Sequence, residues 1–229
     1  YSINVNCVDP KLIPIPLGLS NGYDKNLDID NNLINIEVDK FTKRKDNLLY
    51  LSFADNTNIR LRSGLKNYFS QYKWAKILYE KNEIVEYEKD LKDSNFVLCP
   101  QGNGIDTHRI WETLYCGSIP ILEDHIGFNQ FKKLPVMFVD DFTKLSEKSL
   151  ENYLETLEVK DLDLIDFNYW KNEIFKKNYD SKNTITITIN KKIFRYMNTK
   201  NILKEKVLRI KNGYFRIVYK FKNKLFTQI

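Results

Sequence analysis

The sequence contains little cysteine, histidine, glycine or proline. Its 229 residues include three Cys, two His, eight Gly and six Pro. Cys7, Cys99 and Cys116 are widely spaced and form no Cys-X-X-Cys or Cys/His pattern, so neither a disulfide framework nor a zinc site is predicted. Collagen-like and low-complexity chains need far more glycine and proline and are excluded. Such sparse cysteine favours a reducing compartment.

Long apolar runs and glycosylation sequons are missing as well. No run approaches the roughly 20 apolar residues that a membrane span needs, and no Asn-X-Ser/Thr sequon is present. We therefore predict a cytoplasmic location, either free or peripheral at a membrane. The first residue is Tyr1, which indicates that the chain begins inside a longer protein and leaves an upstream signal or anchor open.

The composition is that of a globular protein, with 42% hydrophobic and 29% charged residues. Continuous apolar runs predict strands that are buried on both faces, and residues at helical spacing follow most of them. Strands are predicted at residues 48–54, 74–79, 95–100, 118–122 and 135–139, and helices at 60–71, 84–92, 106–116, 146–157 and 166–179. This alternation predicts an α/β fold with a Rossmann-like parallel sheet flanked by helices.

The two ends of the chain have other patterns. Pro14 and Pro16 predict an extended stretch over residues 1–22, followed by a polar loop over 23–46 with a short strand near 33–38. The C-terminal end predicts a strand, a helix and an extended segment, at residues 184–189, 199–211 and 214–221. We therefore divide the chain into a partial N-terminal segment, a Rossmann-like domain and a basic extension, at residues 1–45, 46–182 and 183–229.

The loop Gln101-Gly-Asn-Gly104 links a predicted strand to a predicted helix. Ligands of open α/β sheets bind at the carboxyl ends of strands, and glycines let the backbone approach a ligand closely. The start of the next helix offers free N–H groups and a positive dipole end to a diphosphate. On its own, the pattern also fits an ordinary tight turn.

Three side chains at the start of that helix strengthen the prediction. Thr107 can donate to a phosphate oxygen, Arg109 can pair with a phosphate bidentately, and Glu112 can accept two hydrogen bonds from a ribose diol. The alternatives are that Arg109 is a solvated surface charge and that Glu112 is its i,i+3 partner.

Three further groups of charged residues lie near predicted strands or loops. Arg60 and Arg62 should lie at the same sheet edge, where they can neutralise a leaving diphosphate. Asp28 and Asp30 fall in an Asn-rich loop and are read as solvent-facing, and Asp140-Asp141 is read as a helix cap. No metal site is predicted.

The string Glu112-Thr-Leu-Tyr-Cys-Gly-Ser-Ile-Pro120 resembles the Glu-X4-Gly-X-X-Pro signature in the donor-binding lobe of GT-B glycosyltransferases. The longer string from Cys99 to Pro120 is similar to the exostosin-like group, glycosyltransferase family 47 and its relatives. Residues 11–19 and 134–141 resemble two further strands of that group. The resemblance spans residues 10–145 with gaps.

This resemblance implies a donor-binding lobe and its ligands. Glu112 would hold the ribose of a UDP- or GDP-linked sugar, Thr107 and Arg109 would contact the diphosphate, and the loop residues Gly102, Asn103 and Gly104 would face the phosphates or the sugar. Family members often have Arg where Gln101 stands, so one phosphate-binding charge is lost here. The segment 1–45 would lie on the acceptor side, and 46–182 would be the nucleotide-sugar-binding domain.

The implied activity is transfer of a sugar to a glycan or glycolipid hydroxyl, with inversion, without a metal ion and with no cofactor besides the donor. Inversion needs a general base. Asp106 and His108 are candidates, and His125 is the only other histidine. We expect the base to lie upstream of residue 1 or within residues 1–45.

Residues 191–224 hold twelve Lys or Arg and one acid, Glu205. This basic tail fits a solvated face, an anionic membrane surface or, less well, a nucleic acid backbone. Two alternative functions stay open. One is a non-catalytic module that binds nucleotide sugars or glycans, because a GT-B enzyme usually has two Rossmann lobes. The other is a nucleic-acid-binding protein that uses the tail. The oligomeric state is not predicted.

Overall fold

The computed structural model describes residues 2–7, 9–10, 12–20, 38–79, 83–159 and 162–180. Residues 1–174 form one compact unit and residues 175–229 form a second, of which only the end of one helix is described. The domain boundaries predicted from the sequence stay predictions. All that follows concerns the first unit.

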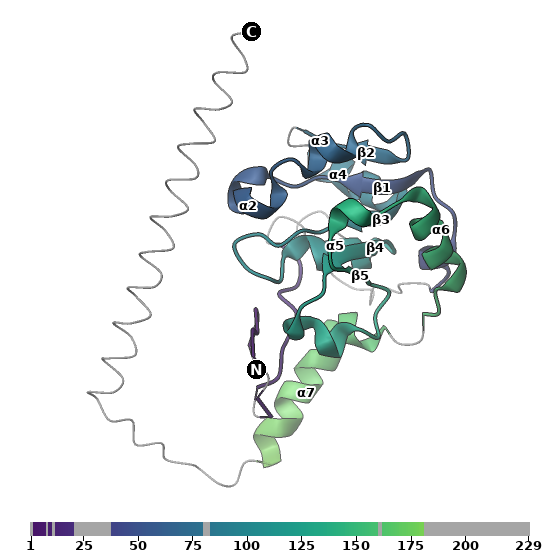
Figure 1. Cartoon of the computed structure of the whole chain (residues 1–229). Helices are drawn as coiled ribbons and strands as arrows, with labels where there is room; N and C mark the ends of the chain where they lie inside the picture. Colours follow the sequence, from purple (N-terminus) through teal and green to yellow (C-terminus); the bar gives the residue numbers. More distant parts are fainter. Residues whose placement is uncertain are drawn as a thin grey trace, which may run out of the picture. The chain divides into compact units, whose positions relative to one another are not determined.

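Five parallel strands form the single sheet of the described residues, in the order β2-β1-β3-β4-β5 (Figure 1). Their bounds are β1 Asn47–Leu51, β2 Ala75–Ile77, β3 Ser94–Leu98, β4 Ile119–Glu123 and β5 Met137–Val139. The pairing is in parallel register throughout, for example Leu49 with Phe96 and Phe96 with Ile119. The predicted α/β fold with a helix-flanked parallel sheet is therefore confirmed.

The two central strands show why the sequence folds this way. Leu49, Tyr50 and Leu51 of β1 are fully buried, and so are the apolar residues of β3. A strand covered on both faces needs an unbroken apolar run rather than alternation, which is the pattern that these segments have. The core sits around these strands.

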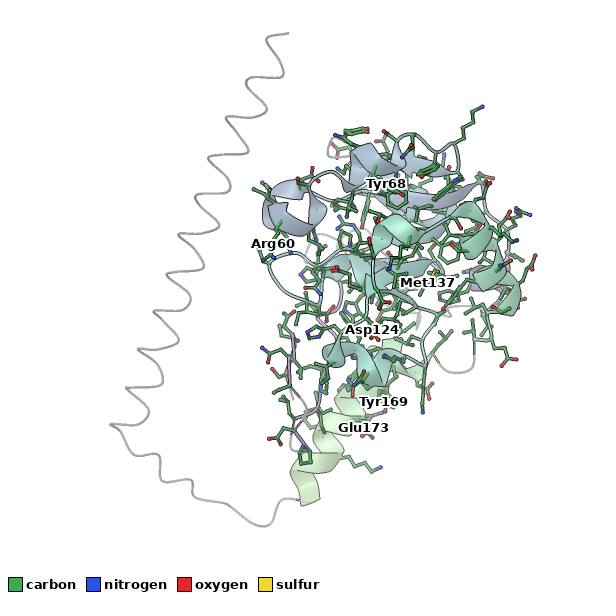
Figure 2. The ribbon with its side chains drawn as sticks, viewed as in Figure 1. Arg60, Tyr68, Asp124, Met137, Tyr169 and Glu173 are labelled. Atoms are coloured by element: carbon green, nitrogen blue, oxygen red, sulfur yellow. The ribbon has the colours of Figure 1, made fainter. Side chains whose placement is uncertain are left out.

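Helices α3 (Leu65–Phe69), α4 (Ile84–Lys92), α5 (His108–Tyr115) and α6 (Glu147–Thr156) cover the sheet. Tyr68 of α3, labelled in Figure 2, donates a hydrogen bond to Thr143 O (2.6 Å). Tyr153 of α6 packs edge-on against Phe96, with ring centroids 5.9 Å apart. The last helix, α7, spans Phe167–Asp180.

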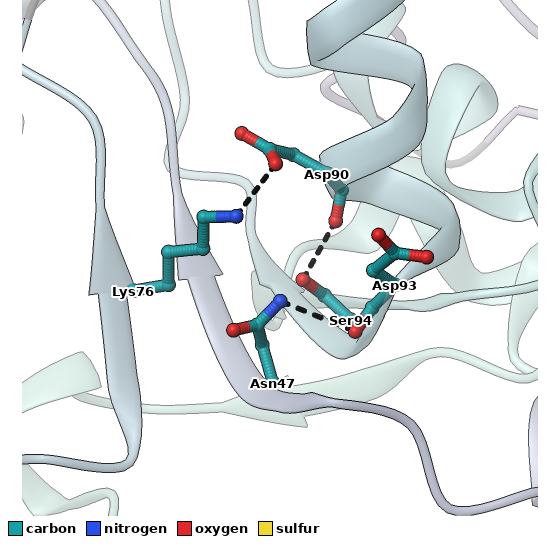
Figure 3. A network of polar contacts seen from close by, with 5 residues as sticks. All are labelled: Asn47, Lys76, Asp90, Asp93 and Ser94. Atoms are coloured by element: carbon teal, nitrogen blue, oxygen red, sulfur yellow. Dashed lines mark hydrogen bonds and ion pairs between the residues drawn. The ribbon is translucent and has the colours of Figure 1, made fainter.

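A polar network fastens the end of α4 to three strands (Figure 3). Lys76 of β2 forms an ion pair with Asp90 (2.6 Å), and Ser94 Oγ donates to the Asp90 carbonyl (2.7 Å). Asn47 Nδ2 donates to Asp93 O (3.3 Å). Asn47 and Ser94 begin β1 and β3, so this network lies at the amino edge of the sheet, opposite the carboxyl edge where ligands bind.

The helix predicted over residues 60–71 is wrong as a single element. It is two short helices, α2 (Ile59–Arg62) and α3. Gly64 between them has a φ of 91°, a left-handed conformation that glycine adopts readily and that interrupts an α-helix.

Other predictions differ in detail or fall elsewhere. A short helix, α1 (Asp39–Thr42), lies where a loop was predicted, and β1 ends earlier than predicted because the turn η1 (Asp55–Thr57) follows it. The strand predicted near 33–38 and the three elements predicted beyond residue 183 lie outside the described residues, apart from Val38 itself. Within the described ranges, no helix has the length and apolarity to cross a membrane.

Candidate functional site

The carboxyl ends of β1 and β3 lie at the switch point of the strand order, which is the position where a ligand-binding crevice is expected. The connection after β1 leads to β2 on one side, whereas β3, β4 and β5 follow on the other. Ligands of open α/β sheets bind at such a switch point, outside the carboxyl ends of the strands. The two segments that leave these ends are residues 52–62 and 99–109, which contain the sequence-predicted site.

Helix α5 carries the predicted donor-binding side chains and is well defined at both ends. Thr107 is its N-cap residue, and its hydroxyl is buried without a hydrogen-bond partner among the described residues. At the other end, Gly117 has a φ of 68°. Its N–H donates to Leu114 O (3.0 Å) and the Ser118 N–H donates to Thr113 O (3.1 Å), which is the Schellman arrangement.

Glu112 is buried on α5, with 6% of its surface exposed. Ser20 Oγ donates to its Oε1 (2.8 Å) and Tyr87 Oη donates to its Oε2 (3.0 Å). Burial raises the pKa of Tyr87 well above its usual value, so its phenol stays protonated and can donate. Each carboxylate oxygen has two lone pairs, so Glu112 keeps acceptor capacity. The structure gives no Arg109–Glu112 ion pair, the sequence-based alternative.

Arg109 is half-buried and is bonded to the end of β1, so it is not a solvated surface charge. Its Nη2 donates to the Ser52 carbonyl, at the end of β1, and its Nε is buried without a hydrogen-bond partner among the described residues. Burial lowers the pKa of Arg109, but the nearby Tyr87, Cys99 and Glu112 outweigh it, and the net shift is upward. Within the part of the chain that the structure describes, Thr107 and Arg109 therefore each carry a buried polar atom without a hydrogen-bond partner.

Arg62 is buried and holds the two segments of the crevice together. It donates to the carbonyls of Pro100 (2.7 Å) and Gln101 (2.9 Å), and to Ala54 O (3.0 Å) in the other segment. Desolvation and the positive charge of the nearby Arg109 together lower the pKa of Arg62 to about 10. These bonds occupy much of the guanidinium. The geometry thus supports a structural role, and the predicted diphosphate contact of Arg62 stays a prediction.

The loop glycines are explained by neighbouring side chains. An added Cβ on Gly102 would lie 3.0 Å from Arg62 Nη2, and one on Gly104 would lie 2.5 Å from Asn4 Oδ1. Asn103 between them is exposed. Close packing therefore accounts for both glycines, and ligand contact by this loop stays a prediction.

The described part of the N-terminal segment, residues 2–7, 9–10 and 12–20, contacts the start of α5, a feature that the sequence did not predict. Asn4 Oδ1 accepts from the Asp106 N–H (2.7 Å), and the Leu17 N–H donates to Asp106 Oδ2 (2.8 Å). His108 Nδ1 lies 2.8 Å from the Gly18 carbonyl, so Nδ1 carries the proton. Together with the bond from Ser20 to Glu112, these contacts form an N-terminal strap, which we define as residues 2–7, 9–10 and 12–20.

Asp106 gives a first testable prediction. Burial raises its pKa to about 6, against the hydrogen bonds from Leu17 and Trp111. The folded state thus binds the proton of the Asp106 carboxyl group more tightly than the unfolded state does. Protonation of Asp106 therefore contributes its full stabilisation of the fold below about pH 4, and this contribution is lost as the pH rises through 6. Between pH 4 and 7, the free energy of unfolding should fall by on the order of 3 kcal/mol more in the natural protein than in Asp106→Asn. Urea titrations across this range measure it, and parallel pH profiles would contradict the assignment.

An open cavity of about 600 Å³ lies at the carboxyl edge, and Gln101 from the loop before α5 is part of its wall. Arg60 and Asp124, labelled in Figure 2, are both part of its wall. Segments after β1, β3, β4 and β5 contribute its residues, which are Asn58, Arg60, Leu61, Gln101, Glu123, Asp124, Val139 and Asp140. Sequence reasoning missed the acids Glu123 and Asp124, although they directly follow the strand predicted at residues 118–122 and so lie at the same edge. Asp141 is a cap, as predicted, because its side chain accepts from the Thr143 N–H (2.9 Å).

Comparison with known proteins agrees with this arrangement. A family model described as the RXYLT1 C-terminal domain matches residues 59–210, more than half of the chain. The chain belongs to this family. No curated protein matches it.

The RXYLT1 C-terminal domain family is related to the exostosin-like glycosyltransferases. The resemblance seen in the sequence is therefore confirmed at the level of the family, and the particular subgroup stays a prediction. The RXYLT1-type match begins at α2 and covers the whole of α5 and every cavity residue except Asn58. The N-terminal strap lies outside the matched range.

Proposed function

We propose that this protein is a glycosyltransferase that transfers a sugar from a UDP- or GDP-linked donor to a hydroxyl of a glycan or glycolipid. The observation that carries the proposal is the start of α5. Thr107 and Arg109 each hold a buried polar atom without a partner among the described residues. Such orphaned groups are costly unless a ligand pairs with them, and both can donate to phosphate.

The donor would bind with its diphosphate at the start of α5 and its ribose on Glu112. A helix start and an arginine both favour an anion. The ribose diol would replace the Ser20 hydroxyl on Glu112 or use the remaining lone pairs. Arg109 would then occupy the position where negative charge grows on the leaving diphosphate.

The reaction consists of one substitution at the anomeric carbon. The acceptor oxygen forms a bond to this carbon, the bond to the diphosphate oxygen breaks, and the diphosphate keeps the electron pair. A base removes the acceptor proton. His108 has Nε2 as its basic nitrogen, because Nδ1 faces the Gly18 carbonyl, whereas Asp106 is engaged by the Leu17 and Trp111 N–H groups. Of these two candidates, His108 is the better placed to accept a proton.

Glu112→Ala tests the donor site. Loss of a charged hydrogen-bond acceptor should weaken UDP or GDP binding by roughly 1–3 kcal/mol, measured by calorimetry. Glu155→Ala is the matched control, because Glu155 is an exposed acid on α6. Circular dichroism should show that both variants are folded. Unchanged affinity in a folded Glu112→Ala protein would remove the ribose role.

A turnover assay separates the enzyme from a binding module. The full chain is incubated with UDP- and GDP-sugars, and release of free nucleotide diphosphate is followed with and without glycan or glycolipid acceptors. Tight nucleotide binding with no release under any condition would favour the non-catalytic module. Binding of RNA or DNA that survives moderate salt, without nucleotide-sugar binding, would favour the basic tail as the functional element.

A further inference from the structure

The cavity beside Gln101 has the size and the place of a ligand site. Its volume of about 600 Å³ falls within the range of roughly 300–1,000 Å³ that small-molecule sites occupy. Four of the five strands direct a segment into its wall at the carboxyl edge. Only Gln101 among its residues comes from the loop before α5, so the cavity adjoins the proposed diphosphate site without being part of it.

The wall suits a ligand that is rich in hydroxyls. Six of its eight side chains are polar: three carboxylates, two amides and the Arg60 guanidinium. Carboxylates accept hydrogen bonds from hydroxyls, and amides both accept and donate. No lining residue is aromatic, so a nucleobase would find no ring to stack against. The amide of Asn58 already donates to the Gln101 carbonyl (3.2 Å), which fixes one wall.

The charge of the wall selects against anions. Asp124 is balanced by an ion pair with Lys132 (3.0 Å) at the rim. Glu123 and Asp140 remain, with Arg60 as the only cation in the wall and Asp141 next in sequence. The burial of Glu123, together with the charge of Asp141, raises its pKa, as expected where negative charges gather. A bound carboxylate or phosphate would add to this repulsion.

A metal ion is a poorer occupant. Among the residues that the structure describes, no group of three or more His, Cys, Asp or Glu side chains has the arrangement of a metal site. The carboxylates come from the ends of two different strands and face a space far larger than one ion. Their arrangement fits several separate hydroxyl contacts better than one shared cation.

We propose that this cavity binds the sugar ring of the donor and selects a neutral, hydroxyl-rich sugar over one that carries an acidic group, with Glu123 and Asp140 as the specificity-determining residues. The proposal rests on the proposed function, because the diphosphate at α5 would bring the sugar to the cavity. It goes beyond that function by naming the class of sugar.

Matched donor pairs test it. UDP-glucose and UDP-glucuronic acid differ only at carbon 6, where a hydroxymethyl group becomes a carboxylate, and GDP-mannose and GDP-mannuronic acid form the equivalent pair. Calorimetry gives the dissociation constants of these four donors, UDP and GDP for the full chain. The same titrations are run on Glu123→Gln, Asp140→Asn and the double variant, which remove charge and keep polar atoms. Glu155→Gln is the control for charge alone.

The donor with the neutral sugar should have a dissociation constant at least about tenfold lower than the donor with the acidic sugar. This ratio corresponds to a like-charge penalty of about 1.4 kcal/mol. In the double variant this ratio should fall to about threefold or less, with the nucleotide affinity unchanged. The single variants should lie between. Equal binding of both sugars in the natural protein, or a ratio that survives the double substitution, overturns the proposal.

The outcomes distinguish this proposal from the donor site itself. Binding of UDP or GDP without discrimination between the sugars overturns only the neutral-sugar proposal. Absence of nucleotide binding overturns the proposed function instead. In that case, saturation-transfer NMR with methyl glucoside and methyl glucuronide decides the cavity alone. Signal from the glucoside that weakens in the double variant supports the cavity, and signal from neither sugar, or equally from both, overturns it.

Discussion

Trp111→Ala should lower the free energy of unfolding by about 4 kcal/mol, the range of large aromatic truncations in a core. Trp111 is 1% exposed and packs edge-on against Phe131, with ring centroids 5.1 Å apart. Its indole N–H also donates to Asp106 Oδ1 (2.8 Å), so the substitution removes one bond from a buried carboxylate. A total stability of roughly 5–15 kcal/mol is usual for a domain, so this single loss is a large fraction.

Urea unfolding followed by circular dichroism at constant pH measures this effect. Trp111→Phe is the matched variant, because it keeps most of the ring and loses the indole donor. Trp111→Phe should lower the free energy of unfolding clearly less than Trp111→Ala does. If Trp111→Ala unfolds within about 1 kcal/mol of the natural protein, Trp111 is not the anchor that the packing indicates.

Arg109→Ala should weaken UDP or GDP binding by roughly 3 kcal/mol, about a hundredfold, because a bidentate contact with phosphate comprises two charged hydrogen bonds. Arg109→Lys keeps the charge and loses the planar fork, so its loss should be smaller, about tenfold. Both variants also lose the hydrogen bond from the Arg109 guanidinium to the Ser52 carbonyl. Their thermal unfolding must therefore be compared with that of the natural protein.

Arg44→Ala controls for the removal of a positive charge. Arg44 is 80% exposed at its side chain and pairs with Glu151 on α6. Its loss should leave nucleotide affinity unchanged. An Arg109→Ala protein that is folded and binds nucleotide within twofold of the natural protein would exclude the diphosphate role and would leave the orphaned Nε unexplained.

Local pattern predicted the elements of this fold, but not their order in the sheet. Apolar runs located β1 and β3 because both faces of these strands are buried. The order β2-β1-β3-β4-β5 depends on which side of β1 each connection crosses, and no residue type records that choice. The break at Gly64 was visible as a glycine, yet its positive φ depends on how α2 and α3 pack.

The candidate site was predictable only where its residues lie on one element. Thr107 is the N-cap of α5 and Arg109 and Glu112 lie in its first two turns, so their places on one element follow from the sequence alone, and the three-residue spacing puts Arg109 and Glu112 on one face. The partners of Glu112 come from far away in the sequence, and neither Ser20 nor Tyr87 carries a local signal. Arg62 shows a second limit of sequence-based prediction. Its charge and its place after a predicted strand suggested a ligand contact, whereas in the structure it donates to the backbone carbonyls of Gln101, Ala54 and Pro100.

The acids of the cavity were predictable in position but not in function. Glu123 ends β4 and Asp140 follows β5, so each stands where the carboxyl ends of parallel strands meet. This rule could have placed them at the same edge as Gln101, but it was not applied to either residue in the sequence-based prediction. The rule could not show that the space between them is open, since that depends on the side chains of four separate segments.

The N-terminal strap has a consequence for how this chain is made. Asn4, Leu17 and Ser20 find their partners only at Asp106 and Glu112, so the ribosome releases the strap long before the residues that it binds. Contacts between positions so far apart in the sequence require a long loop to close first, so they form late in folding. We therefore expect the sheet to assemble first and the strap to dock last, which makes completion of the proposed donor site a final step of biosynthesis.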